Sequence, residues 1–280
     1  MKKAAFYTLG CKVNQYETEA MAELFADSGY EIKEFTEVAD VYVINTCSVT
    51  NMGDRKSRQI IRRAKKLNPN AVIAVTGCYA QTAPDEVLAI EGVNLVLGTK
   101  DRKNIVTLVE ELNTESNINH VSDIMSNHEF EELQIKQYSN RTRAFIKIQE
   151  GCNQFCSYCI IPYARGPVRS RAKDDVVREI KELAHNGFKE IILVGIHVAS
   201  YGVDLGDTTL ESLIMDVDKI DGVERIRLSS IEPMTLNQEF IDSIKDSKKL
   251  CHHFHISLQS GCDETLKRMN RKYTTAQFKG

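Results

Sequence analysis

The chain has 280 residues, of which 42% are hydrophobic and 27% are charged, and its formal net charge is −3. This composition is typical of a globular protein, and the length favours two domains. The small negative charge excludes a polycation, so a nucleic acid would have to bind to local basic patches. No apolar run reaches the roughly 20 residues of a membrane-spanning helix, and we expect a cytoplasmic protein that does not contact a membrane.

The first 112 residues alternate short apolar segments, which predict strands, with amphipathic segments, which predict helices. The expected strands are 4–9, 41–45, 72–76 and 94–97, and the expected helices begin near Asn14, Asp54, Pro84 and Asp101. Asn14 is expected to cap its helix, with Glu17 as its capping-box partner. Four successive strand–helix units favour an α/β fold with a doubly wound, flavodoxin-like parallel sheet.

Residues 113–140 are rich in Asn, Ser, His and Glu and show little periodicity, so we expect a linker there. Its apolar residues Phe130, Leu133 and Ile135 are candidates to dock on a neighbouring element. The strand–helix pattern then resumes, with expected strands 144–149, 190–194, 224–229 and 254–259 and expected helices 175–186 and 209–220. We therefore expect domains at residues 1–112 and 141–280, joined by a linker at 113–140.

Eight cysteines stand in a chain that is expected to be cytoplasmic, where thiols stay reduced. Metal ligation or catalysis is therefore a better interpretation than disulfides. Three of the cysteines, Cys152, Cys156 and Cys159, directly follow an expected strand, where α/β folds place their chemistry. Three thiolates hold three irons of a four-iron cluster and leave the fourth iron open to bind a substrate.

Other interpretations account for these three cysteines less well. A structural zinc site needs a fourth Cys or His at short spacing, and none follows in this loop. A thioredoxin-like redox pair of Cys156 and Cys159 leaves Cys152 without a role. Ordinary buried thiols do not explain three cysteines within eight residues.

A second set, Cys11, Cys47 and Cys78, is spread along the sequence, but each cysteine follows a different expected strand. Because the carboxyl ends of parallel strands share one edge of a sheet, these thiols are expected to converge. A second three-cysteine cluster explains this placement, and three half-buried thiols without a ligand role are the alternative. Cys251 and Cys262 have no such placement, and we expect neither to be a ligand.

Longer motifs surround both sets of cysteines. They are TLGCKVNQYE, NTCSVTNMGDRKSRQ, TGCYAQ, GCNQFCSYCIIPYARGPVRSR and HFHISLQSGCDETLKRMNRKYT. The spacing C-x-x-x-C-aromatic-C resembles the radical S-adenosylmethionine signature, and the motifs together resemble the radical S-adenosylmethionine methylthiotransferase family. Within this family the chain is most similar to the MtaB type, which modifies N6-threonylcarbamoyladenosine beside the tRNA anticodon. Other types act on isopentenyladenosine in tRNA or on an aspartate of a ribosomal protein.

The resemblance implies two [4Fe–4S] clusters and S-adenosylmethionine as cofactors. The auxiliary cluster would be held by Cys11, Cys47 and Cys78, and the radical-generating cluster by Cys152, Cys156 and Cys159. The resemblance also places Tyr158 and Gly195 at the cofactor. It makes Ser230 and Glu232 candidates for contacts to the ribose or the methionine, although polar strand ends that face solvent are the alternative. No catalytic side chain follows from it.

The implied reaction adds a methylthio group to an adenine of tRNA, with S-adenosylmethionine as the source of both the methyl group and the radical. An electron donor such as flavodoxin or ferredoxin would reduce the cluster. A different class of function, an iron–sulfur scaffold for electron transfer or sensing, stays open. The resemblance also leads us to expect a C-terminally truncated chain. Relatives have a six-stranded partial (βα) barrel and then a small β-barrel RNA-binding domain, whereas four barrel strands are expected here.

Two basic groups are candidates for contacts with the tRNA backbone. The expected helix after Cys47 carries Arg55, Lys56, Arg58, Arg62, Arg63, Lys65 and Lys66. The second group, Arg165, Arg169 and Arg171, follows the cluster loop, and we expect Arg165 to contact phosphate. For the helix, the alternative is a solvated face with Ile60, Ile61, Ala64 and Leu67 turned inward.

Overall fold

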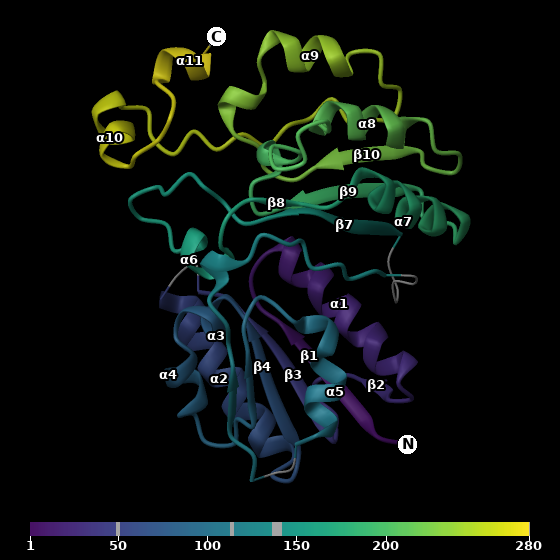
Figure 1. The fold of residues 1–280 in the computed structure, drawn as a ribbon, viewed down its shortest axis with the longest axis vertical. Coiled ribbons are helices and arrows are strands. Elements are labelled where there is room, and N and C mark those ends of the chain that lie inside the picture. Colours follow the sequence, from purple (N-terminus) through teal and green to yellow (C-terminus); the bar gives the residue numbers. More distant parts are fainter. Residues whose placement is uncertain (49–50, 113–114, 136–141, 280) are drawn as a thin grey trace. The chain divides into compact units, whose positions relative to one another are not determined.

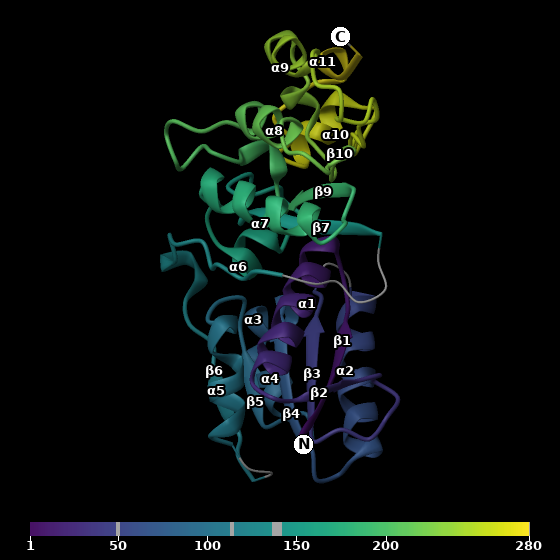
Figure 2. The same ribbon diagram turned by 90° about the vertical axis from the view of Figure 1, so that its right-hand side faces the viewer.

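The computed structural model describes residues 1–48, 51–112, 115–135 and 142–279. The chain divides into two compact units, each of which contains its own sheet (Figure 1 and Figure 2). Unit 1 comprises Met1–Asn127, Glu131–Ile135 and Tyr163–Arg165, and unit 2 comprises His128–Phe130, Lys136–Pro162 and Gly166–Gly280.

Unit 1 contains a six-stranded parallel sheet in the order β2–β1–β3–β4–β5–β6. Its strands are β1 (Lys3–Thr8), β2 (Glu31–Lys33), β3 (Val41–Thr46), β4 (Val72–Gly77), β5 (Leu95–Leu97) and β6 (Ile118–His120). Strand β3 is buried along its whole length, as expected for a parallel strand covered on both faces. The carboxyl ends of β1, β3 and β4 lie next to one another, because these strands are neighbours in the sheet.

Helices cover both faces of this sheet. They are α1 (Lys12–Asp27), α2 (Asn51–Leu67), α3 (Cys78–Thr82), α4 (Pro84–Leu88) and α5 (Ile105–Glu110), with the 3₁₀ turns η1 (Arg102–Asn104) and η2 (Ile124–Ser126). Ile61 of α2 belongs to the hydrophobic core that contains Tyr42, and Phe25 of α1 belongs to the core that contains Val43. Tyr42 and Val43 point to opposite faces of β3, so the predicted doubly wound fold is confirmed.

The short edge strands β2 and β6 were not predicted from the sequence. Strand β6 lies within residues 113–140, where a linker was expected, and all three of its residues are exposed. Such a strand has no apolar signal of its own and is defined by its pairing with β5. Leu133 and Ile135 in the same segment are buried in unit 1. The domain boundaries at 112 and 141 stay a prediction.

Helix α1 begins before the residue that was expected to cap it. The helix starts at Lys12, and the backbone of Cys11 forms its N-cap. Asn14 is instead buried, and its side-chain amide donates to Leu9 O and to Thr46 O, both at 2.9 Å. The prediction of an Asn14 cap was wrong because this amide joins the ends of two strands rather than the start of the helix.

Unit 2 contains a four-stranded sheet in the order β10–β9–β7–β8. Strands β7 (Arg143–Glu150), β9 (Glu190–Gly195) and β10 (Arg225–Leu228) are parallel, and the short β8 (Arg169–Ser170) runs antiparallel to β7. The helices are α7 (Lys173–His185), α8 (Leu210–Asp218), α9 (Gln238–Ile244), α10 (Asp263–Arg268) and α11 (Thr275–Lys279), with the turns η3 (Val198–Ser200) and η4 (Pro233–Thr235). A further helix, α6 (Ile161–Arg165), starts in unit 2 and ends in unit 1. None of the helices in the described ranges combines the length and apolar character that a bilayer span requires.

The expected strand 254–259 does not form. In the described residues, two isolated parallel bridges form in this part of the chain, Ile226 with Leu250 and Ile231 with Ile256. Gln259 has a φ of 63°, which belongs to the left-handed region and is incompatible with an extended strand. The alternation of apolar residues in 254–259 therefore predicted a strand where the chain makes only a single bridge.

Candidate metal centres

The loop that carries Cys152, Cys156 and Cys159 begins where β7 ends in unit 2. Gly151 makes the turn into this loop with a φ of 76°, and a Cβ there would lie 1.8 Å from Pro167 O. Glycine is required at this turn because any side chain would collide with backbone. The loop is then closed by a hydrogen bond from the Cys159 N–H to Cys156 O at 3.0 Å. All three cysteines thus lie in one loop at the carboxyl end of a parallel strand.

These three thiols lie close enough to affect one another's ionisation. The pKa of Cys152 is raised to about 11, first by burial and further by the like charge of the Cys159 and Cys156 thiolates, against one backbone hydrogen bond that lowers it. Burial also raises the pKa of Cys159. Three partly buried thiolates so close together repel one another, and a bound metal is needed to keep all three ionised. The three cysteine sulfurs therefore fit the ligands of an iron–sulfur cluster.

Cys156 has a charged hydrogen-bond donor beside it. Arg271 Nη1 donates to Cys156 Sγ at 3.2 Å, and Arg271 Nη2 donates to both carboxylate oxygens of Glu232 at 2.7 and 2.6 Å. Glu232 was predicted as a cofactor contact, with a solvent-facing strand end as the alternative. Its carboxylate is held by Arg271 and is still 25% exposed, so contact of Glu232 with a cofactor stays a prediction.

Polar atoms without hydrogen-bond partners gather near the carboxyl ends of β9 and β10. His197 Nε2, Ser229 Oγ and Arg271 Nε are buried, and none has a partner within the described residues. Burial lowers the pKa of His197, against the opposing charge of Glu232, whose Oε1 lies 3.8 Å from His197 Nε2. Buried polar atoms are almost always satisfied in folded proteins. These atoms therefore fit a bound polar cofactor such as S-adenosylmethionine.

The other predicted cofactor residues lie in the same unit. Gly195 ends β9. A Cβ there would lie only 2.9 Å from Gln149 Oε1, so the strand end has little room for a larger residue. Tyr158 is about half exposed and donates its hydroxyl to Gln259 Oε1 at 3.1 Å. Ser230 is exposed, which matches the solvent-facing alternative. Contacts of these residues with a cofactor stay predictions.

The second set of cysteines lies at one edge of the sheet in unit 1. Cys11 follows β1, Cys47 follows β3 and Cys78 follows β4, and these three strands are adjacent. A Cβ built on Gly10 would lie 3.0 Å from Cys47 Sγ, and Cys11 contributes to the electrostatics of Cys78. The strand order therefore brings the three cysteines together as the sequence predicted, and their role as ligands stays a proposal. In the part of the chain that the structure describes, no three His, Cys, Asp or Glu side chains form a site for a single metal ion.

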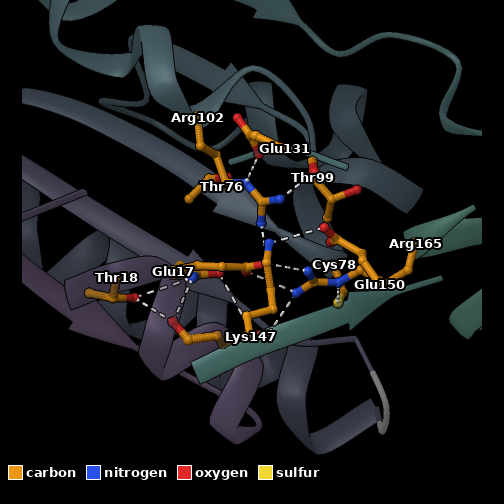
Figure 3. A network of polar contacts seen from close by, with 12 residues as sticks. Glu17, Thr18, Thr76, Cys78, Thr99, Arg102, Glu131, Lys147, Glu150 and Arg165 are labelled. Carbon is orange, nitrogen blue, oxygen red and sulfur yellow. Dashed lines mark hydrogen bonds and ion pairs between the residues drawn. The ribbon is translucent and has the colours of Figure 1, made fainter. Parts of the chain in front are cut away.

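Arg165 is buried beside Cys78 (Figure 3). Its Nε donates to Cys78 Sγ at 3.3 Å, while Nη1 donates to Glu17 Oε1 at 2.6 Å and Nη2 to Asn14 Oδ1 at 2.7 Å. Burial raises the pKa of Cys78, and the guanidinium of Arg165 opposes this by favouring the thiolate. Arg102 forms a second ion pair with Glu17 at 2.5 Å. The carboxylate of Glu17 is thus held between two arginines.

The prediction that Arg165, Arg169 and Arg171 contact RNA was wrong. All three side chains are fully buried, and each forms ion pairs within the protein. Arg165 pairs with Glu17, and Arg171 pairs with Glu179. A guanidinium that is enclosed in this way cannot reach a phosphate without breaking an internal ion pair.

Helix α2 carries basic side chains that are exposed, unlike the three buried arginines. Its outer face forms a shallow groove lined mostly by Arg55, Lys56, Arg58, Arg62, Arg63 and Lys66. Its inner face buries Ile60, Ile61 and Ala64, as predicted. An amphipathic helix is expected whether its outer face binds RNA or is only solvated, so contact of α2 with RNA stays a prediction.

Two known sequence families match the chain. Residues 3–98 match the "Uncharacterized protein family UPF0004", and residues 146–279 match the "Radical SAM superfamily". The first match covers nearly all of the parallel sheet of unit 1, and the second starts within β7 and includes the cysteine loop.

Similar proteins include two that are named threonylcarbamoyladenosine tRNA methylthiotransferase MtaB. The one from Bacillus subtilis is 51% identical over 99% of this chain and 62% of its own length, and the one from Aquifex aeolicus is 43% identical over 99% and 67%. A tRNA-2-methylthio-N(6)-dimethylallyladenosine synthase from Thermoanaerobacter pseudethanolicus is 38% identical over 97% and 59%. The chain thus spans about three fifths to two thirds of these relatives.

A solved structure of a radical S-adenosylmethionine methyltransferase, TsrM from Kitasatospora setae, shares the fold with a TM-score of 0.65. It is 16% identical, and the match covers 99% of this chain and 66% of the other. Most of the sheet of unit 2, and the whole loop with its three cysteines, lie within the match to the radical SAM superfamily, so the chain contains a radical S-adenosylmethionine domain. More narrowly, the chain belongs to the radical S-adenosylmethionine methylthiotransferase family.

Proposed function

We propose that the protein is a tRNA methylthiotransferase that adds a methylthio group to the adenine of N6-threonylcarbamoyladenosine next to the anticodon. The observation that carries the proposal is the presence of two three-cysteine sets, each at the carboxyl ends of parallel strands. The relatives named for this activity are 51% and 43% identical to the chain. A relative named for the dimethylallyladenosine reaction is 38% identical, which makes that reaction the second candidate.

In unit 2, Cys152, Cys156 and Cys159 would hold the radical-generating [4Fe–4S] cluster. Together with S-adenosylmethionine, this cluster supplies the radical that attacks an unactivated carbon. The chain holds the three thiolates on one loop. The buried His197 Nε2 and Ser229 Oγ, which have no hydrogen-bond partner in the described residues, would contact the cofactor.

In unit 1, Cys11, Cys47 and Cys78 would hold the auxiliary [4Fe–4S] cluster, at which the sulfur to be transferred is bound. Cys78 is buried, so its thiol alone would keep its proton. Arg165 donates a charge-assisted hydrogen bond to this sulfur and stabilises the thiolate that a cluster requires.

We propose tRNA as the substrate and an electron-transfer protein as a partner. The exposed cations of α2 would contact tRNA phosphates, since phosphate contacts supply most of the sequence-independent affinity for nucleic acids. An electron donor such as flavodoxin or ferredoxin would reduce the cluster, and the reaction would take place in the cytoplasm.

The test is mass spectrometry of tRNA nucleosides from cells that lack the protein and from the same cells after its full-length gene is restored, with a Cys152→Ala version as the control. Loss and recovery of the methylthio form of N6-threonylcarbamoyladenosine supports the proposal. A change confined to methylthio-isopentenyladenosine would favour the second candidate. If neither nucleoside changes, and the purified reduced protein does not cleave S-adenosylmethionine, the protein is an iron–sulfur scaffold.

A further inference from the structure

The cysteine loop of unit 2 is fastened by a segment that follows it by more than a hundred residues. We call this segment, Arg268–Arg271, the brace. The backbone N–H of Ser157 donates to Met269 O at 3.1 Å, and the Ser157 hydroxyl donates to Arg268 O at 2.9 Å. The brace therefore fixes the backbone between Cys156 and Cys159.

Two side chains of the brace also contact the loop. Asn270 Nδ2 donates to Phe155 O at 2.9 Å, and Arg271 Nη1 donates to Cys156 Sγ at 3.2 Å. The other end of the Arg271 guanidinium forms the two-pronged ion pair with Glu232. Arg271 is only 7% exposed, so water does not weaken these contacts strongly.

The brace keeps its own shape because it forms the turn at the C-terminal end of helix α10. Asn270 has a φ of 57°, a left-handed conformation that Asn tolerates better than most residues. The Asn270 N–H donates to Lys267 O at 3.0 Å, and the Arg271 N–H donates to Leu266 O at 2.9 Å. Leu266 is buried, which anchors the helix end. The hydrogen-bonded turn at the end of α10 therefore fixes the backbone from which the Arg271 side chain extends.

We propose that Arg271 and Asn270 are positioning residues for the radical-generating cluster. Arg271 holds the Cys156 thiolate in place and ties it to Glu232, and Asn270 fixes the loop through the Phe155 carbonyl. Residues that surround metal ligands orient them and tune the metal, and hydrogen bonds to cluster sulfurs change the reduction potential. This inference rests on the proposed function, because it requires a cluster on Cys152, Cys156 and Cys159.

The test uses the full chain with Cys11, Cys47 and Cys78 replaced by Ala, so that all the iron belongs to the loop of unit 2. Into this background come Arg271→Gln and Asn270→Gly, where glycine keeps the left-handed turn but loses the amide. Arg268→Gln is the matched control, since it removes the same charge from the same segment and keeps the carbonyl that Ser157 uses. Each protein is loaded anaerobically with iron and sulfide and then exposed to a chelator.

We expect Arg271→Gln to bind iron about 10- to 100-fold more weakly than the control, which is the loss of affinity typical of residues that support metal ligands, and therefore to lose iron faster to the chelator. Its electron paramagnetic resonance spectrum and midpoint potential should also shift, whereas those of Arg268→Gln should match the background protein. Asn270→Gly should lose iron faster as well, and hydrogen exchange at the Ser157 amide should be faster in the metal-free protein. Thermal unfolding of each metal-free variant shows whether it is folded.

Equal iron-loss rates, spectra and potentials for Arg271→Gln and Arg268→Gln would overturn the inference. If the three alanine replacements prevent folding, the same comparison is made in the wild-type chain. One of its two iron-loss phases should then become faster with Arg271→Gln, and neither phase should change with Arg268→Gln. A wild-type protein that binds no cluster on the loop would overturn both this inference and the proposed function. A cluster that depends on Arg271, in a protein that leaves tRNA unmodified, would support the inference and contradict the proposed function.

Discussion

Arg165 and Cys78 are 87 residues apart in the chain, yet the Nε of Arg165 donates a hydrogen bond to the Sγ of Cys78 at 3.3 Å. The same guanidinium is held by Glu17 and Asn14, which belong to α1. The positive charge of Arg165 thus lies beside the buried sulfur of Cys78, and the carboxylate of Glu17 holds the guanidinium in place. The guanidinium thereby opposes the effect of burial, which is the larger of the two and raises the pKa of the Cys78 thiol.

We predict that Arg165→Met destabilises the protein by about 3 kcal/mol, because breaking a buried ion pair leaves a carboxylate without its partner. Arg102 stays beside Glu17 and limits the loss. Thermal and urea unfolding of the metal-free protein measure the effect. Arg62→Met, on the exposed face of α2, is the control and should change the unfolding free energy by less than about 0.5 kcal/mol. Equal unfolding curves for the two variants would show that the Arg165 ion pair contributes nothing.

Gly151→Ala should disrupt the cysteine loop of unit 2. The new Cβ would lie 1.8 Å from Pro167 O, so the backbone must move. Gly187→Ala is the control, because Gly187 also has a positive φ of 92° but no atom lies within 4 Å of the added Cβ. We expect the control to lose only the ~1 kcal/mol that a left-handed alanine costs, and Gly151→Ala to lose iron binding as well. Normal iron loading by Gly151→Ala would contradict the fixed turn.

The iron content of the protein should be about eight atoms per chain after anaerobic reconstitution, as two four-iron clusters require. Replacing Cys152, Cys156 and Cys159 with Ala should halve the iron and abolish cleavage of S-adenosylmethionine. Replacing Cys11, Cys47 and Cys78 should also halve the iron but leave the cleavage intact.

Two further cysteines supply the control for the iron measurement. Cys251→Ala and Cys262→Ala should retain all the iron, because neither residue lies with a set of three cysteines. Full iron in the Cys152/Cys156/Cys159 variant, or zinc in place of iron, would refute the assignment of the radical-generating site.

Reversing two charges on α2 with Arg62→Glu and Arg63→Glu should weaken tRNA binding and flatten its salt dependence. The slope of log K against log salt should fall by roughly one for each phosphate contact that is lost. The matched control is Arg178→Glu with Lys181→Glu on α7, which changes the net charge equally on another exposed helix face. If both double variants bind tRNA alike at low and high salt, α2 is an ordinary solvated helix.

The sequence predicted those parts of the fold that have a local signal. The apolar runs of β3 and β4 were found almost to the residue, and the cysteines after them were correctly placed at one sheet edge. Strand β6 was missed because its residues are polar and exposed, so that only its pairing with β5 defines it. The alternation of apolar residues in 254–259 predicts a strand, but it carries no signal for the left-handed backbone at Gln259, which is incompatible with a strand.

The roles of arginines could not be predicted in this way. Arg165 follows the cluster loop in the sequence and looks like a phosphate ligand, yet its partners lie far away in α1 and at Cys78. Arg271 stands in the motif RMNRKYT, which indicated the family but no contact, and its partner Cys156 is 115 residues distant. Such roles depend on long-range packing, which no pattern in a short stretch of residues encodes.

Unit 1 is discontinuous, and this has a consequence for its biosynthesis. Its last piece, Tyr163–Arg165, comes after the cysteine loop in the chain, although the rest of unit 1 ends at Ile135. A ribosome must therefore produce the whole loop with Cys152, Cys156 and Cys159 before Arg165 can close on Glu17. All six proposed iron ligands have been synthesised by the time the first unit can be completed. A fragment that ends at residue 112 lacks Glu131–Ile135 and Tyr163–Arg165 and therefore cannot form the complete unit 1.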